Sequence, residues 1–117
     1  MQGDDADVHV ITSVLSDERA RRILAETHAE ARSATELSDC CGVSEQTVYR
    51  RLDTLSECGL VTERVEMEPD GHHYHVYRST FDRVLIEFSD GEFEATVARR
   101  GRMADRFTEF VNEVREE

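Results

Sequence analysis

The sequence contains no lysine, and all 14 of its basic residues are arginine. Its 26 acidic residues are spread along the whole chain and give a formal net charge of -12. Ordinary domains use lysine freely, whereas an acidic surface without lysine is typical of proteins from salt-loving organisms. At 1 M salt charges are screened within about 3 Å, so repulsion among carboxylates costs little. We interpret the composition as halophilic; an acidic protein with a basic partner is the alternative.

Other absences exclude whole classes of protein. No apolar run approaches the ~20 residues that span a bilayer, so we expect no membrane partner. Residues 1–7 lack the basic and apolar regions of a signal peptide and are expected to be frayed. Three cysteines do not suggest a disulfide framework. No catalytic constellation stands out among so many acidic residues. We therefore expect a cytoplasmic protein that is not an enzyme and has no cofactor.

The spacing of apolar residues predicts helices in the first half of the chain. The helical period runs through residues 8–15 and again through residues 20–27, where Ser16 and Asp17 offer a cap. A capping-box pattern at Ser33 starts a third helix, and Gly42 ends it because glycine takes the left-handed conformation without strain.

Residues 33–60 predict two short helices joined by a tight turn, which is the layout of a helix-turn-helix. The second helix begins at Ser44, and its inward face carries Val48, Leu52 and Leu55. Residues 60–67 and 73–78 then alternate like strands around a turn at residues 69–71. This hairpin directly after the second helix is the pattern of a wing.

The remainder of the chain predicts a second hairpin and a last helix. Residues 84–88 and 93–97 flank Asp90-Gly91, a strong hairpin dipeptide, although a continued helix is the alternative. From Arg99 onward the period is helical. We therefore expect an α+β fold, with a winged helix-turn-helix DNA-binding domain at residues 8–80 and a hairpin with a C-terminal dimerisation helix at residues 81–117.

Over roughly residues 8–80 the chain resembles the winged helix-turn-helix regulators of the ArsR-like superfamily. The segment Leu-Ser-Asp-Glu-Arg-Ala-Arg-Arg-Ile-Leu at residues 15–24 looks like that family's second-helix signature, and residues 35–61 follow its helix-turn-helix pattern. The acidic, all-arginine composition makes haloarchaeal members, including the RosR-type stress regulators, look like the nearest relatives. The resemblance implies a sequence-specific transcriptional regulator that binds double-stranded DNA as a homodimer.

The resemblance also raises the question of metal sensing. Many family members bind metal through a Cys-x-Cys pair, but here Cys40 and Cys41 are adjacent. Adjacent side chains on a helix diverge by about 100°, so we expect no metal site. Packing is favoured over redox sensing for all three cysteines, and Cys40 is expected to be the most accessible.

A recognition helix meets the major groove through its N-terminal residues. Gln46 can bridge adenine, Arg50 can bridge guanine, and Thr47 can contact a thymine methyl group or a phosphate. The wing histidines favour phosphate or groove contact over plain surface or metal binding. The predicted DNA contacts are Ser44, Gln46, Thr47, Tyr49, Arg50, Arg51, His72, His73 and His75. The alternatives for the helix are a solvated face or a protein-interaction module.

An apolar stripe on the last helix favours a partner surface over packing within the chain, because such regulators read paired half-sites as symmetric dimers. The predicted dimerisation residues are Val8, Ile11, Leu15, Met103, Phe107, Phe110, Val111 and Val114. With so many carboxylates near DNA, inorganic ions are expected at the interface.

Overall fold

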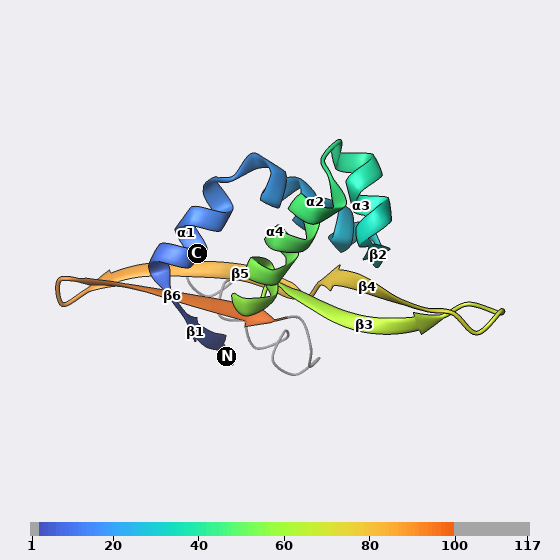
Figure 1. Cartoon of the computed structure of the whole chain (residues 1–117). Coiled ribbons are helices and arrows are strands. Elements are labelled where there is room, and N and C mark those ends of the chain that lie inside the picture. The colour runs from blue at the N-terminus through green and yellow to red at the C-terminus, as the bar shows by residue number, and fades with distance from the viewer. Residues whose placement is uncertain (1–2, 100–117) are drawn as a thin grey trace.

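The computed structural model describes residues 3–99, which form an α+β fold with four helices lying over two antiparallel sheets (Figure 1). The helices are α1 (Val8–Ser16), α2 (Glu18–Ala29), α3 (Ala34–Cys41) and α4 (Glu45–Glu57). The strands are β1 (Gly3–Ala6), β2 (Arg32–Ser33), β3 (Val61–Met67), β4 (His73–Ser79), β5 (Phe81–Ser89) and β6 (Glu92–Arg99). Helices α3 and α4, followed by the β3–β4 hairpin, form a winged helix-turn-helix, as predicted.

The helices begin where the sequence places capping residues. In each case a side-chain oxygen accepts a hydrogen bond from a backbone N–H in the first turn. The residues that cap in this way are Asp7, Asp17, Ser33 and Ser44. The predicted capping box at Ser33 is present in full, with Glu36 reaching back to the Ser33 N–H. Gly42 ends α3 at φ 68°, which confirms its predicted left-handed conformation.

The two sheets have strand orders β2-β4-β3 and β1-β6-β5, and their two long hairpins project in opposite directions from the helical body (Figure 1). The predicted second hairpin is confirmed over β5 and β6, and the continued helix is excluded. Its turn is Asp90-Gly91, with φ values of 54° and 79°. Positive φ at both central residues matches the twist of the flanking strands.

One hydrophobic core joins the helices to both sheets. Its largest fully buried apolar residues are Ile11, Ile23, Leu37, Val48, Leu52, Leu55, Leu60 and Val97. Two buried hydroxyls are satisfied inside it: Ser79 Oγ lies 2.8 Å from both the Leu24 carbonyl oxygen and the Thr27 hydroxyl. The core therefore draws residues from both sides of position 80.

The expectation of a frayed N-terminus is wrong for residues 3–6. They form β1, which pairs antiparallel with β6 from Gly3 opposite Ala98 to Ala6 opposite Ala95. The two-residue strand β2 was not predicted either; it pairs with β4 in the other sheet. The predicted C-terminal helix falls outside the described residues.

Candidate nucleic-acid interface

Helix α4 presents a polar face because its aliphatic residues are all turned inward. Val48, Leu52 and Leu55 are buried. Gln46 and Arg50 follow the helical period on the opposite side and are exposed. Among residues 3–99 the Arg50 guanidinium has no ion pair, so it can bind an external anion or base edge. The first half of α4 therefore has the donors that base recognition requires.

The N-terminus of α4 is held in a defined geometry by its cap. The Ser44 hydroxyl oxygen accepts a hydrogen bond from the Thr47 N–H at 3.1 Å and lies 3.0 Å from the Thr47 hydroxyl. Thr47 is half-buried, while Ser44 is exposed. These contacts stiffen the turn that would approach DNA, and the helix dipole there favours an anion such as phosphate.

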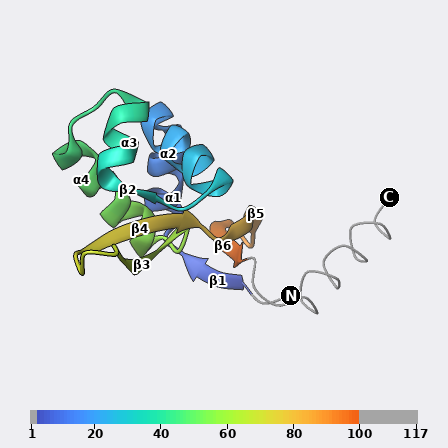
Figure 2. The ribbon, with the colours of Figure 1, turned by 90° about the vertical axis from the view of Figure 1, so that its right-hand side faces the viewer.

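One flank of α4 lies beside the base of the wing. Tyr49 is exposed on α4, and Tyr77 of β4 belongs to the wing. Burial first, and then the neighbouring Glu63 carboxylate, raise the pKa of Tyr77 to about 12. Tyr77 therefore stays protonated, and its hydroxyl donates to Glu63 Oε2 at 3.4 Å. Figure 2 shows α4 and the turn of the wing on the same side of the molecule.

Arg51 is used inside the fold. Its Nε donates to Asp17 Oδ2 at 2.7 Å, and Asp17 also caps α2 by accepting from the Arg19 N–H at 2.9 Å. This ion pair ties α4 to the start of α2 and so fixes the angle between them. Because its Nε is already engaged and most of its side chain is buried, Arg51 is less available to DNA than Arg50, and its predicted DNA contact stays a prediction.

The environment of Asp17 lowers the pKa of its carboxyl group. Partial burial alone would raise that pKa, but the hydrogen bond from Arg51 and the one from the Arg19 backbone outweigh it. The carboxylate is therefore charged whenever the protein is folded near neutral pH.

The wing histidines differ in their surroundings. His72 Nδ1 lies 2.8 Å from Asp70 Oδ2, and His75 Nδ1 lies 2.5 Å from Glu63 Oε2. The hydrogen bonds from His72 hold the pKa of Asp70 below its usual value. His73 is exposed opposite Met67 and has no recorded partner among residues 3–99. His73 is thus the wing histidine most available to a phosphate.

Two of the three cysteines, Cys41 and Cys58, lie in surroundings that disfavour a reactive thiol. Contrary to the predicted divergence, the Cys40 and Cys41 sulfur atoms lie only 3.8 Å apart. Burial, followed by the Cys40 contact, raises the pKa of Cys41 to about 11, and burial also raises that of Cys58. High pKa values disfavour the nucleophilic thiolate. Within residues 3–99 no three potential metal ligands come together.

The candidate dimerisation residues of α1 are not equally available. Val8 and Leu15 are half-buried at the edge of the core, but Ile11 is completely buried and has no surface to offer a partner. The candidates on the C-terminal stripe, Met103, Phe107, Phe110, Val111 and Val114, lie outside the described residues.

The comparison with protein families agrees with this geometry. Residues 15–64 match the family described as a helix-turn-helix domain, a span that covers α2, α3, α4 and the start of β3. No curated protein matches the chain. In the described part of the chain, none of the helices has the length and apolarity needed to cross a membrane. The match supports a regulator that binds DNA through the helix-turn-helix.

Proposed function

We propose that the protein is a sequence-specific transcriptional regulator that binds DNA as a homodimer in the cytoplasm of a halophile. One observation carries the proposal: the first half of α4 in a helix-turn-helix exposes Gln46 and Arg50, and Arg50 has no ion pair among residues 3–99. Gln46 would bridge an adenine, and Arg50 would bridge a guanine. We propose that the protein is not an enzyme. The narrower proposal is that it regulates a stress response, as RosR-type regulators do.

The wing supplies the second contact of the proposal. His73 would meet a phosphate, with His72 and His75 beside it where other winged helices carry stronger cations. His72 is paired with Asp70 and His75 with Glu63, so these two histidines do not neutralise the other carboxylates of the wing. Inorganic cations would bridge those other carboxylates to DNA. Residues 8–80 would read DNA, and residues 81–117 would carry dimerisation.

A protein-interaction module is the second candidate, because the outward face of α4 is acidic in its second half. Asp53 and Glu57 are exposed there, one and two turns beyond Tyr49. These carboxylates would repel phosphate and suit a basic protein partner. The two candidate functions differ in one requirement: only the DNA-binding function needs Gln46 and Arg50, in the first half of α4, to contact bases.

The experiment begins with selection of bound genomic fragments in concentrated potassium chloride, followed by fluorescence anisotropy on the best site. Arg50→Ala and Gln46→Ala should each weaken specific binding by roughly 1–3 kcal/mol, the value of a bidentate base contact. Arg83→Ala removes the same charge from the β5–β6 hairpin and serves as the control, with affinity unchanged. If both α4 variants bind as tightly as the parent, α4 does not read bases and the protein-interaction candidate gains.

A further inference from the structure

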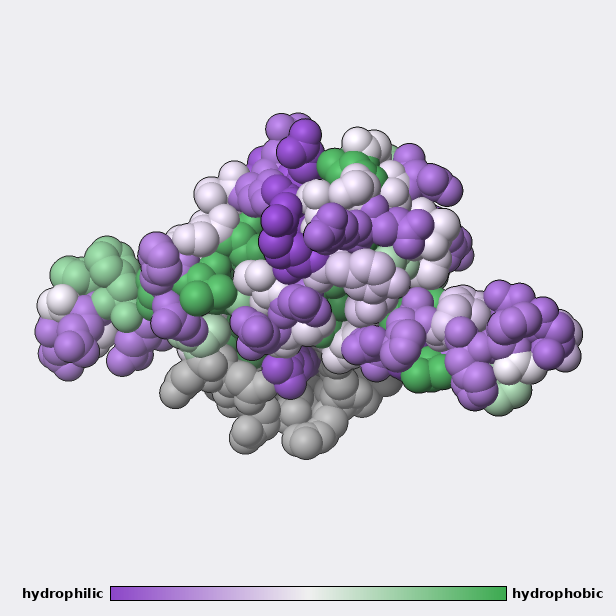
Figure 3. All heavy atoms as spheres, in the orientation of Figure 1, coloured by the Kyte–Doolittle hydropathy of each residue, from purple (hydrophilic) through white to green (hydrophobic). Residues whose placement is uncertain are grey.

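The β5–β6 hairpin exposes a strip of large apolar residues in an otherwise acidic molecule. Ile86, Phe88 and Phe93 are 43%, 64% and 62% exposed, and we name them the hairpin strip. Phe88 stands directly opposite Phe93, and their ring centroids are 4.6 Å apart. In Figure 3 hydrophobic residues gather on this hairpin, whereas most of the face shown is hydrophilic. An exposed strip of this kind marks an interaction site.

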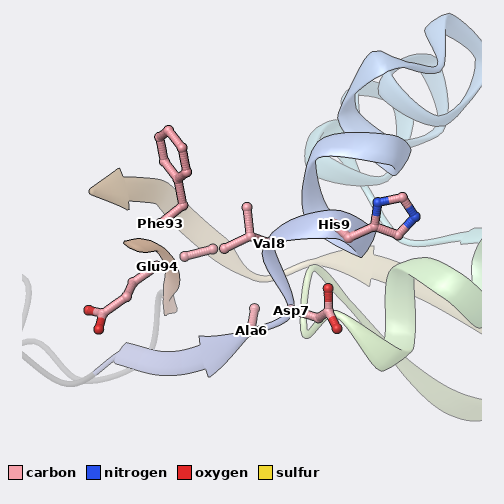
Figure 4. Close-up of a pocket in the computed structure, with 7 residues that line it drawn as sticks. Ala6, Asp7, Val8, His9, Phe93 and Glu94 are labelled. Carbon is pink, nitrogen blue, oxygen red and sulfur yellow. The ribbon is translucent and has the colours of Figure 1, made fainter. Parts of the chain in front are cut away.

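The strip continues into a hollow beside α1. The hollow has a volume of about 490 Å³ and is lined by residues 6–9 and 93–95. Figure 4 shows Phe93 and Val8 on its walls, with the carboxylates of Asp7 and Glu94 at its rim. An apolar cavity of about 150 Å³ is enough to hold a benzene ring. The hollow therefore has room for an aromatic side chain.

The chain itself carries a segment of matching chemistry. Eighteen residues follow Arg99, and they contain Met103, Phe107 and Phe110 on one helical period. The start of the segment is basic, with arginines at 100, 102 and 106 against one carboxylate at 105. As a helix it would span about 27 Å, and a nine-residue strand such as β5 spans about 30 Å. Length and apolar spacing fit the hairpin, and the basic start of the segment fits its acidic rim.

The direction of β6 indicates whether the strip binds the C-terminal segment of the same chain or that of a second copy. Strand β6 runs from the hairpin tip towards the helical body and ends there at Arg99. At that end the apolar face of the sheet is already closed, because Val97 is 0% and Ala95 is 2% exposed in the core they share with α1. A segment leaving Arg99 starts at this closed end, whereas a partner can meet the strip from its open end.

We propose that the hairpin strip and the adjoining hollow bind residues 103–114 of a second copy, so that two chains exchange their C-terminal segments. An aromatic residue of the partner, Phe107 or Phe110, fills the hollow, and the partner's Arg106 faces Asp7 and Glu94. The proposal rests on the dimer part of the proposed function. It leaves the wing free, since the wing projects from the opposite end of the molecule (Figure 1).

The first test measures the dimer by sedimentation equilibrium in concentrated potassium chloride. Phe88→Ser with Phe93→Ser should weaken dimerisation at least about 30-fold, the effect of losing one aromatic hot spot. Val65→Ser with Met67→Ser removes two equally exposed apolar residues from the wing and should leave the dimer unchanged. Circular dichroism checks that each variant is folded, which is expected because none of these side chains belongs to the core.

The second test separates exchange from packing within one chain. The hairpin variant is mixed with a tail variant, Phe107→Ser with Phe110→Ser, each impaired in dimerisation alone. With exchange, the intact tail of one chain meets the intact hairpin of the other, so the mixture regains heterodimers with one native docking site. If each tail binds its own hairpin, both docking sites are broken and mixing restores nothing.

The outcomes also separate this inference from the proposed function. If the hairpin variant dimerises as tightly as the parent, or if the mixture stays monomeric, the exchange of C-terminal segments is overturned. The proposed DNA-binding dimer of the parent is not affected by either result. If the parent protein is monomeric, the dimer part of the proposed function is wrong as well. Loss of DNA binding with an intact dimer contradicts only the role of α4.

Discussion

Asp17 shows how one residue can support the interface without touching DNA. It caps α2 and pairs with Arg51 of α4, so its removal should affect both the helix and the angle between helices. Asp17→Ala should lower the free energy of unfolding by about 1–2 kcal/mol, the sum of a lost cap and a partly exposed ion pair. Asp17→Ser keeps a capping oxygen and should cost less than about 1 kcal/mol. Urea unfolding measures both, and equal losses would show that the cap contributes nothing.

The same carboxylate gives the stability a pH dependence of known sign. Its pKa is lower in the folded chain than in the unfolded chain, where it is about 4. The stabilisation is therefore present above about pH 4 and is lost as the pH falls through the folded-state pKa. The difference between the parent and Asp17→Asn should shrink between pH 6 and pH 3. A difference that stays constant would mean that Arg51 does not favour the charged form.

At the scale of elements, the turn between α3 and α4 sets the geometry of the helix-turn-helix. Gly42 has φ 68°, and a Cβ atom placed there would meet nothing within 4 Å. The cost of Gly42→Ala is therefore purely conformational, about 1 kcal/mol in unfolding free energy. Gly42→Asn should cost less, because asparagine tolerates this conformation. Denaturant midpoints test the order, and an alanine variant as stable as the parent would contradict it.

The elements predicted from the sequence are those whose signals are local. The capping box at Ser33, the glycine at position 42 and the dipeptide at 90–91 each act through neighbours within four residues. Periodicity likewise identified the inward face of α4. Strand β1 was missed because its acidic sequence has no strand pattern, and its pairing with β6 joins residues 89 to 95 positions apart.

In the candidate site, too, the features with local sequence signals were predicted and the long-range contacts were not. Outward positions such as Gln46 and Arg50 follow from the helical period alone. The partner of Arg51 lies 34 residues away, and the carboxylate beside His75 lies on the neighbouring strand. Neither contact has a signal in a single sequence, because helix packing and strand register bring the groups together.

At the scale of the whole molecule, the net charge of -12 sets the problem that any DNA contact must solve. An ordinary binder releases counterions from DNA, and its affinity falls steeply with salt. Among residues 3–99, several arginines already form ion pairs with carboxylates and are less able to replace those ions. Arg64 pairs with Glu66, Arg32 pairs with Glu26, and Arg51 pairs with Asp17. Net ion release should therefore be small, or cations should be taken up between carboxylates and phosphates.

We therefore expect the slope of log affinity against log salt concentration to be shallow or even positive above about 1 M, where screening is nearly complete. The wing should contribute most of the cation uptake, because Glu68 is exposed there without a recorded partner among residues 3–99, whereas Glu66 and Asp70 are paired with Arg64 and His72. Glu68→Gln should make the slope more negative, and Glu66→Gln or Asp70→Asn should do so to a smaller extent. Glu87→Gln, on the opposite hairpin, changes the net charge by the same amount as the wing variants and should leave the slope as it is. Titrations of the parent in potassium chloride that show a steep ordinary decline would contradict both the cation uptake and the halophilic interpretation of the sequence.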